Sequence, residues 1–314
     1  KKEMVLCYGN RIKNIQKSGG KAMKVLMAEV NISEGKDLDL VEQVKAALLD
    51  GEAVDVMDIN SNANHNRTVF TYKGSPEAVL DGTKRLAAKA IELIDMTKHT
   101  GSHPRIGAVD VVPFIPVKDV SIDEALVIAR AFGKYLGDEL GVPVYYYEDA
   151  ATCEERKNLV RIRKGEYEAL CERMKDPAWV PDEGPKDFNA KSGATVTGVR
   201  FPLVAFNVNL KTADIAIAKQ IVKAVRGAAG GYQNVRAIAL PLEERGIVQV
   251  SMNLTNYEKT PIHRVFETIK SEASQYGILV EDCELVGPVP VYALEEVLKF
   301  YLRTHTFSME QLYF

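Results

Sequence analysis

The amino-acid sequence predicts an α/β (α+β) fold made of two ferredoxin-like subdomains, each with the element order βαββαβ. The first observation is periodicity, because apolar residues recur at helical spacing in some segments and alternate in others. The second is repetition, because these segments follow one another in a similar order in both halves. The third is composition: a chain of 314 residues that is 46% apolar can bury two cores of ordinary size.

Each element of the first half has a local signal. Apolar residues at helical spacing predict a helix over residues 38–49, after a turn at 31–35. A proline that follows a serine predicts the start of a second helix, over 76–94, and a Ser-x-x-Glu capping box predicts a third, over about 122–140. The strands predicted from apolar runs are 24–30, 53–59, 68–72, 108–115 and 142–147.

The second half predicts the order strand–helix–strand–strand–helix–strand, the split βαβ plan. Residues 203–209 alternate strictly between apolar and polar types, as a half-buried strand does. Helices are predicted over 212–225 and about 262–276, and they should cover one face of a mixed sheet. The remaining predicted strands are 235–240, 248–253 and 279–285.

The domain boundaries follow from changes in composition. Residues 1–22 are basic, weakly periodic and followed by a clean apolar run, so we expect an appended segment there. The two subdomains are then 23–199 and 200–307, with a tail over 308–314. The stretch from 175 to about 199 is rich in Pro, Gly, Asp and Lys. It is too long for an ordinary connection, so we expect it to have a function.

Charge and cysteine usage exclude several classes of protein. Lys and Arg number 40 against 43 Asp and Glu, which argues against a nucleic-acid partner. Apolar runs are far shorter than the roughly 18–20 residues that span a bilayer, and no leader peptide is recognisable. The five histidines form no HExxH motif, so no metal is expected. A soluble cytoplasmic protein is predicted, with scattered reduced cysteines at Cys7, Cys153, Cys171 and Cys283.

The loop over residues 98–107 has the richest chemistry. It places His99, His103 and Arg105 directly before a buried strand, among glycines and a proline that restrict the backbone. Histidine can accept and donate a proton near neutral pH. Asp110, within the strand, could orient an imidazole or hold a cationic substrate group. The residues alone leave open a second interpretation, in which the histidines only cap a helix and contact water.

Residues 58–67 are predicted to form a polar loop between two apolar strands. This segment is longer than a tight hairpin requires, and it presents amide groups and an arginine that could bind a carboxylate in a bidentate manner. These groups suit a zwitterionic substrate, although the segment alone favours a solvated asparagine-rich turn. Its candidate substrate-binding residues are Asn60, Asn64, Asn66 and Arg67.

Two further loops are weaker candidates. The turn at 31–35 (NISEG) could bring Glu34 near a ligand, or Ser33 could simply begin the next helix. The glycine-rich loop at 226–232 could bind an anion through backbone N–H groups. An ordinary helix end with glycine explains this loop equally well.

Taken together, the motifs resemble a known family. The segments NISEG, HNRTVFTYKG, HTGSHPRIGAVDVVPFIPV, GEYEAL, GPKDFNAKSGATVTGVR and FNVNL look like glutamate formiminotransferase, the N-terminal half of formiminotransferase-cyclodeaminase. The resemblance extends from about residue 24 to about residue 301. It implies two α/β subdomains with a ligand cleft between them, and a homodimer.

The resemblance also implies a reaction and its residues. It assigns His103 as the acid/base that transfers a formimino group from N-formiminoglutamate to N5 of tetrahydrofolate, a step of histidine degradation. Tetrahydrofolate is then a co-substrate, and no metal is needed. The implied donor site adds Arg105 and Asp110 to the polar-loop residues. The implied folate-binding residues are Gly184, Pro185, Lys191, Gly193, Arg226 and Gly227.

The chain departs from the family pattern at four positions. Asn62, Asn64 and Ser102 stand where acidic residues are common, and Val30 replaces a usual proline. Less negative charge would weaken attraction for a cationic formimino group and lessen carboxylate tuning of His103. The donor therefore stays open between formiminoglutamate, formiminoglycine and a formyl compound. A non-catalytic folate-binding module is the other alternative.

Overall fold

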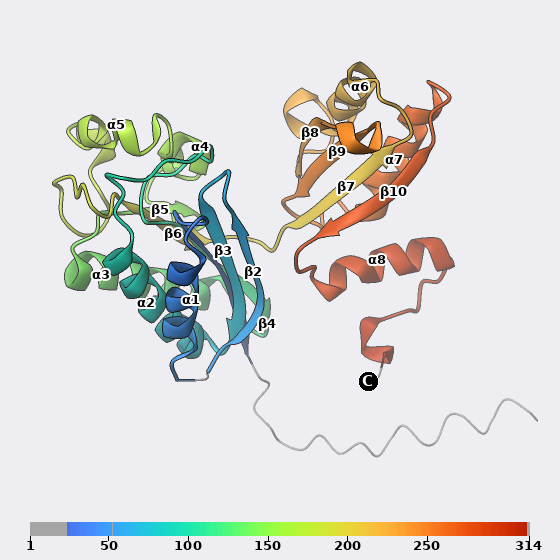
Figure 1. The fold of residues 1–314 in the computed structure, drawn as a ribbon. Coiled ribbons are helices and arrows are strands. Elements are labelled where there is room, and N and C mark those ends of the chain that lie inside the picture. Colours follow the sequence, from blue (N-terminus) through green and yellow to red (C-terminus); the bar gives the residue numbers. More distant parts are fainter. Residues whose placement is uncertain (1–23, 52, 313–314) are drawn as a thin grey trace, which may run out of the picture.

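The computed structural model describes residues 24–51 and 53–312, which form two separate β-sheets (Figure 1). The predicted appended segment over 1–22 lies outside the described residues. One sheet has six strands in the order β2-β3-β1-β4-β6-β5, and the other has four in the order β10-β7-β9-β8. The mixed α/β class with two subdomains, predicted from the sequence, is confirmed.

Helices α1, α2 and α3 cover one face of the first sheet (Figure 1). Strands β2, β3, β1 and β4 pair antiparallel, whereas β6 pairs parallel with β4 and with β5. The elements in chain order are β1 (Val25–Ile32), α1 (Leu38–Leu49), β2 (Asp55–Asn62), β3 (Arg67–Gly74), α2 (Pro76–Leu93), β4 (Val109–Lys118), α3 (Ile122–Leu140), β5 (Val144–Glu148) and β6 (Thr195–Val199). The first six elements have the order βαββαβ, and a further helix and two strands extend the sheet.

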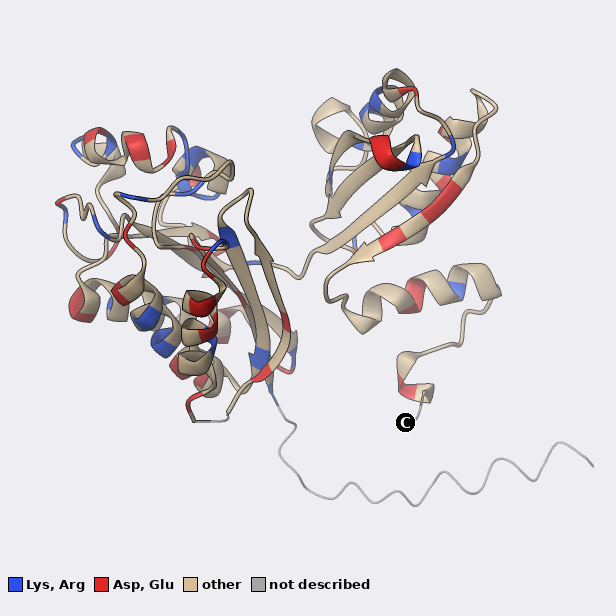
Figure 2. Ribbon diagram, in the orientation of Figure 1, with Lys and Arg blue, Asp and Glu red and all other residues tan. Residues whose placement is uncertain are grey.

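Two short helices, α4 (Leu159–Ile162) and α5 (Glu166–Arg173), contribute to a smaller apolar cluster. Ile162 and Leu170 pack there with Tyr145, Tyr147 and Val196 of strands β5 and β6. Both helices also carry charged side chains of both signs (Figure 2). Their packing holds the segment between them, residues 163–165, near the end of the sheet where β4 begins.

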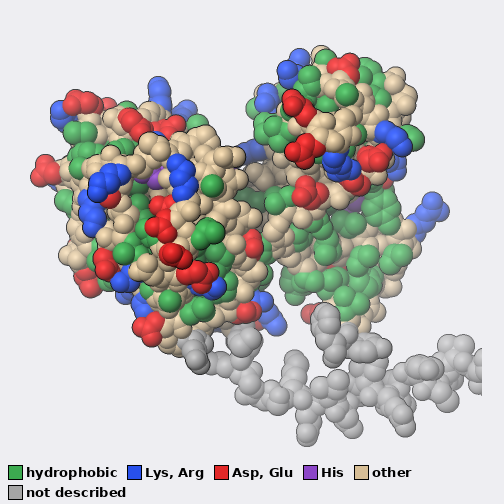
Figure 3. Space-filling model, in the orientation of Figure 1, with side chains coloured by type: hydrophobic (Ala, Val, Ile, Leu, Met, Phe, Trp, Pro, Cys, Tyr) green, Lys and Arg blue, Asp and Glu red, His purple; other side chains and the backbone are tan. Residues whose placement is uncertain are grey.

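The second sheet is entirely antiparallel, and α6 and α7 pack on it. Its elements are β7 (Val204–Leu210), α6 (Ile215–Val225), β8 (Val235–Leu242), β9 (Ile247–Leu254), α7 (Ile262–Ser274) and β10 (Val280–Val286). A last helix, α8 (Val291–Leu302), contacts α7, where the rings of His263 and Phe300 stack with centroids 4.6 Å apart. Apolar side chains remain exposed on α8, and the space-filling view shows a broad apolar surface in this part of the molecule (Figure 3).

Two expectations about connections were wrong. Residues 58–67 do not form a long loop, because β2 continues to Asn62 and β3 begins at Arg67, leaving a four-residue turn at 63–66. The asparagines of this edge strand satisfy the backbone ladder while their side chains face solvent, so a polar sequence does not end the strand. The stretch 175–199 is not wholly irregular either, because its last residues form the buried strand β6.

Helices α4, α5 and α8 were not predicted. Among the described residues, no helix combines the length and apolarity that crossing a membrane requires.

Candidate active site

Three connections meet at the end of the first sheet where β4 begins: residues 33–37, the hairpin turn 63–66 and the loop 94–108. Asn66 joins them, in the left-handed conformation (φ 49°) that asparagine tolerates better than most residues. Its Oδ1 accepts from the backbone N–H of Gly35 (3.0 Å), and its Nδ2 donates to the carbonyl of Thr100 (3.0 Å). Its own carbonyl lies 3.0 Å from Nε2 of His99. Asn66 is therefore buried as a structural link, although the sequence suggested substrate contact.

Gly101 lets the histidine loop lie directly on the hairpin turn. A Cβ atom at this position would lie 2.3 Å from the carbonyl oxygen of His65, which is backbone and cannot simply rotate away. We therefore expect Gly101→Ala to displace the loop and to lower kcat by about 10–100-fold, because small misplacements of reacting groups are costly. Steady-state kinetics would measure this. Lys98→Ala, at an exposed site of the same loop, is the control, and equal activity of both variants would contradict the expectation.

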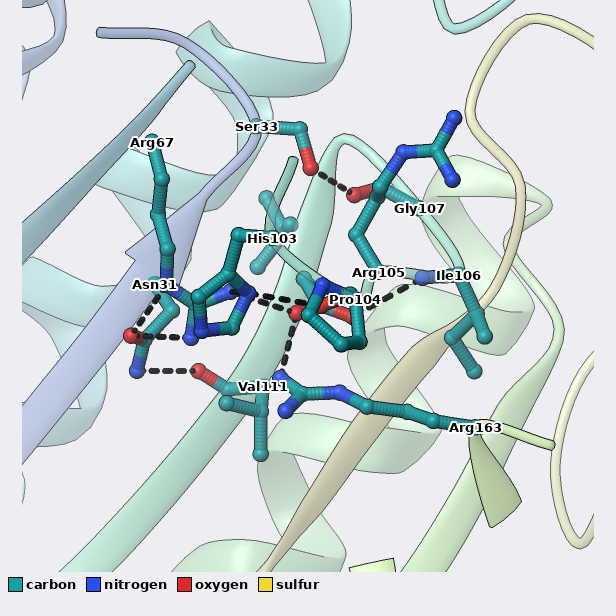
Figure 4. Close-up of polar contacts among 12 residues, drawn as sticks. Asn31, Ser33, Arg67, His103, Pro104, Arg105, Ile106, Gly107, Val111 and Arg163 are labelled. Carbon is teal, nitrogen blue, oxygen red and sulfur yellow. Dashed lines mark hydrogen bonds and ion pairs between the residues drawn. The ribbon is translucent and has the colours of Figure 1, made fainter. Parts of the chain in front are cut away.

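Arg67, at the start of β3, points its guanidinium toward Asn31 and Asp110. Its Nε donates to Oδ1 of Asn31 (3.0 Å), and its Nη1 donates to Oδ2 of Asp110 (2.8 Å). The amide of Asn31 is held in turn by the carbonyl of Val111 (3.3 Å), on β4 (Figure 4). The carboxylate that Arg67 binds in the structure is thus one of the protein's own.

Asp110 is fully buried and accepts hydrogen bonds at both oxygens. The N–H of Ile106 donates to Oδ1 (3.0 Å), while Arg67 and Arg163 both bind Oδ2. Burial by itself would raise the pKa of Asp110, but Arg163, Arg67 and the Ile106 N–H together hold that pKa below its usual value. Asp110 therefore stays ionised, and its partners are two arginines rather than an imidazole.

His103 lies beside this cluster, half-buried. Its Nδ1 is 2.8 Å from the carbonyl oxygen of Pro104 and 3.1 Å from Nη1 of Arg67. The carbonyl requires a proton on Nδ1, whereas the guanidinium requires a lone pair there, so one neutral tautomer cannot serve both. We assign the proton to Nδ1 on the shorter contact, which leaves Nε2 as the basic nitrogen.

The surroundings of His103 predict an unusual pH dependence. Burial, then Arg67 and Arg163, lower the pKa of His103 to about 4, against an opposing effect of the Pro104 carbonyl. Because the folded state disfavours the proton, its contribution to stability is complete above pH 6.5 and is lost as the pH falls toward 4. We expect kcat/KM to stay level from neutral pH to about pH 5 and to fall near pH 4. An acid limb near 6.5 would contradict this.

Arg105 is buried and engaged by two carboxylates. Its Nη1 donates to Glu166 and to Glu168, each at 2.8 Å, and its Nε donates to Nδ1 of His99 (3.2 Å). These bonds connect the histidine loop to the first turn of α5. The guanidinium that the resemblance assigns to substrate is therefore occupied by acidic residues.

A surface cavity of about 460 Å³ opens beside this ion pair, and its lining does not include His103. The lining residues are His99, Thr100, Gly101, Arg105, Gly165, Glu166 and Glu168.

The other expected donor residues lie at the hairpin. Asn60 is exposed on the edge strand β2. The carbonyl of Asn64 accepts from both the backbone N–H and the hydroxyl of Ser102, at 3.3 and 3.2 Å. Asn64 and Ser102 thus bring the turn and the histidine loop together through the backbone, at two of the positions where acidic residues were expected.

The expected folate residues fall into two groups. Gly184, Pro185, Lys191 and Gly193 lie between α5 and β6, and Gly193, at φ 65°, packs against the carbonyl of Ile106. Arg226 and Gly227 follow α6 in the second subdomain, where Arg226 lines a cavity of about 510 Å³. The described residues contain no group of His, Cys, Asp and Glu that could hold a metal ion.

Arg163 was missed at the sequence level. It follows α4 in a basic run, Arg161 to Lys164, that carried no element prediction. The signal that could have identified it is this run of charges directly before the GEYEAL motif, where a solvated loop would not need two arginines.

Comparison with known proteins matches the whole described chain. The model of the formiminotransferase domain, N-terminal subdomain, matches residues 25–200, and that of the formiminotransferase domain matches 205–312. Glutamate formimidoyltransferases of Streptococcus pyogenes serotype M1 and Thermoplasma acidophilum are 43% and 41% identical, over 91% of this chain and 95% of theirs. Formimidoyltransferase-cyclodeaminase of Gallus gallus is 43% identical over 89% of this chain and 53% of its own length. The chain thus spans about half of the two-activity relative.

Proposed function

The chain belongs to the formiminotransferase family, and on this premise we propose that it uses His103 to transfer a formimino group from N-formiminoglutamate to tetrahydrofolate. It is a transferase of one-carbon groups, and its products are 5-formiminotetrahydrofolate and glutamate. The observation that carries the role of His103 is its neutral imidazole, anchored at Nδ1 and free at Nε2, in a loop fixed by Asn66.

The proposed chemistry uses one imidazole twice. N5 of tetrahydrofolate attacks the amidine carbon of the donor and forms a tetrahedral intermediate. Nε2 of His103 accepts the proton that N5 loses, and the imidazolium then donates it to the glutamate nitrogen as the carbon–nitrogen bond breaks. The lowered pKa of His103 keeps the base neutral before attack and makes the imidazolium a ready acid afterwards. Holding two substrates in contact supplies much of the remaining acceleration.

The proposed substrate sites follow the two groups of residues. We propose that folate lies in a cleft between the subdomains 23–199 and 200–307, where Gly184, Lys191 and Arg226 contribute from both sides. The positive φ of Gly184 and Gly193 supports this, since glycine lets a backbone approach a ligand closely. The donor lies at the hairpin end, near Asn60 and Asn64.

We extend the proposal to a homodimer that acts in the cytoplasm in histidine degradation. The exposed apolar residues of α8 support self-association, because large apolar surfaces on soluble proteins usually mark contacts. They include Val291, Tyr292, Phe300, Tyr301 and Leu302.

The experiment that tests the function follows the absorbance of 5-formiminotetrahydrofolate with tetrahydrofolate and either N-formiminoglutamate or N-formiminoglycine. Turnover with the glutamate donor supports the proposal. Turnover with the glycine donor alone would mean that Asn62, Asn64 and Ser102 accompany a different donor. Silence with both donors, in protein that folate still protects against heating, would favour a binding module.

A further inference from the structure

Two arginines share one carboxylate beside His103. Arg67 and Arg163 both bind Oδ2 of Asp110, which is completely buried. One carboxylate balances one guanidinium charge, and neither arginine forms an ion pair with another acidic group among the described residues. Asn31, the other partner of Arg67, is neutral. One positive charge is therefore left uncompensated in the cluster, next to the imidazole.

The two guanidinium groups differ in how fully they are used. Arg67 donates from Nε and Nη2 to Asn31 and from Nη1 to Asp110. Arg163 donates from Nη2 alone within the described part of the chain. Its Nε is buried without a partner, whereas its Nη1 is neither bonded nor enclosed. Unsatisfied donors of a charged group are costly, so Arg163 has the capacity to bind an anion that Arg67 lacks.

We propose that Arg163 binds the α-carboxylate of the formimino donor, an inference that rests on the proposed function. In N-formiminoglutamate the formimino nitrogen and the α-carboxylate are attached to the same carbon. A donor whose amidine carbon lies at Nε2 of His103 therefore places its α-carboxylate close to the Asp110 cluster. A guanidinium is the side chain best suited to a carboxylate, through paired N–H donors.

This placement gives the donor a second effect on the reaction. A carboxylate at Arg163 neutralises the surplus charge that helps to keep His103 unprotonated. The donor would then make His103 a stronger base at the moment when the base is required.

The test compares two donors that differ only in the α-carboxylate: N-formiminoglutamate and N-formimino-4-aminobutanoate. With the wild-type protein we expect a strong preference for the glutamate donor in kcat/KM. Arg163→Met should lower kcat/KM for that donor by about 10–100-fold, the value of a charge-assisted hydrogen bond. It should change the value for the truncated donor little, and it should leave the KM for tetrahydrofolate unchanged.

Two further variants separate binding from support of Asp110. Arg163→Lys keeps a charge beside the carboxylate and should retain part of the preference. Arg161→Met removes an exposed charge from the same helix and should retain all of it. An equal loss with both donors in folded Arg163→Met protein would overturn the proposal, because Arg163 would then act only through Asp110.

The outcome stays separate from the test of the function itself. If the wild-type protein transferred from neither donor, the proposed function would fail, and heat protection by glutamate would decide the role of Arg163. Protection that Arg161→Met keeps and Arg163→Met loses would support carboxylate binding. Equal protection of both variants would overturn it.

Discussion

His103→Gln should lower kcat for formimino transfer by about 10²–10⁴-fold, the usual contribution of an acid/base group. Glutamine can still donate a hydrogen bond to a neighbouring carbonyl, but it cannot accept and return a proton. The side chain of His103 bonds only to Pro104 and Arg67 among the described residues, so we expect the free energy of unfolding to change by about 1 kcal/mol or less. Single-turnover kinetics and heat protection by folate measure the two effects.

The matched control is His65→Gln. The His65 ring is exposed and lies 5.7 Å from the His103 ring, so it is the nearest alternative carrier of a proton. We expect this variant to keep most of its activity. A His103→Gln enzyme that remained active, or a His65→Gln enzyme that lost as much, would overturn the assignment of the base.

Asp110→Asn should lower the free energy of unfolding by about 3–5 kcal/mol, because it leaves two arginines without their buried counter-ion. The amide still accepts from the N–H of Ile106, so the loss reports on charge rather than on shape. Urea denaturation measures the effect. Activity should fall as well, since Arg67 contacts both Asp110 and His103.

Asp138→Asn is the comparison for this second expectation. Asp138 pairs with Lys134 on the exposed face of α3, and such surface pairs contribute less than about 1 kcal/mol. Similar small losses in both variants would show that the Asp110 cluster does not stabilise the fold.

The sequence predicted the elements whose signals are local. The capping box of Ser121 and Glu124 is present, and α1 and α3 have the predicted bounds. Strand β6 was missed because its stability comes from β4 and β5, its partners on either side, which are distant in sequence. Helix α5 has few apolar residues, so its pattern is weak, and it is fixed instead by Leu170 and by the pairing of its acids with Arg105.

The candidate site was predicted as separate motifs rather than as one network. His103, Arg67 and Asp110 were each identified from residue type and neighbours. That Arg67 binds Asp110 depends on the pairing of β1 with both β3 and β4, which no local pattern specifies. Arg163 reaches Asp110 from 53 residues away, through the packing of α4.

The order of these segments along the chain matters during synthesis. Asn31, Arg67, His103, Asp110 and Arg163 all precede the strand β6 that completes the first sheet. Domains usually fold as units, N-terminal first, while the ribosome adds about 5–20 residues per second. The surroundings of His103 can therefore form on the emerging chain before the second sheet has been translated, and substitutions in the second sheet should spare them.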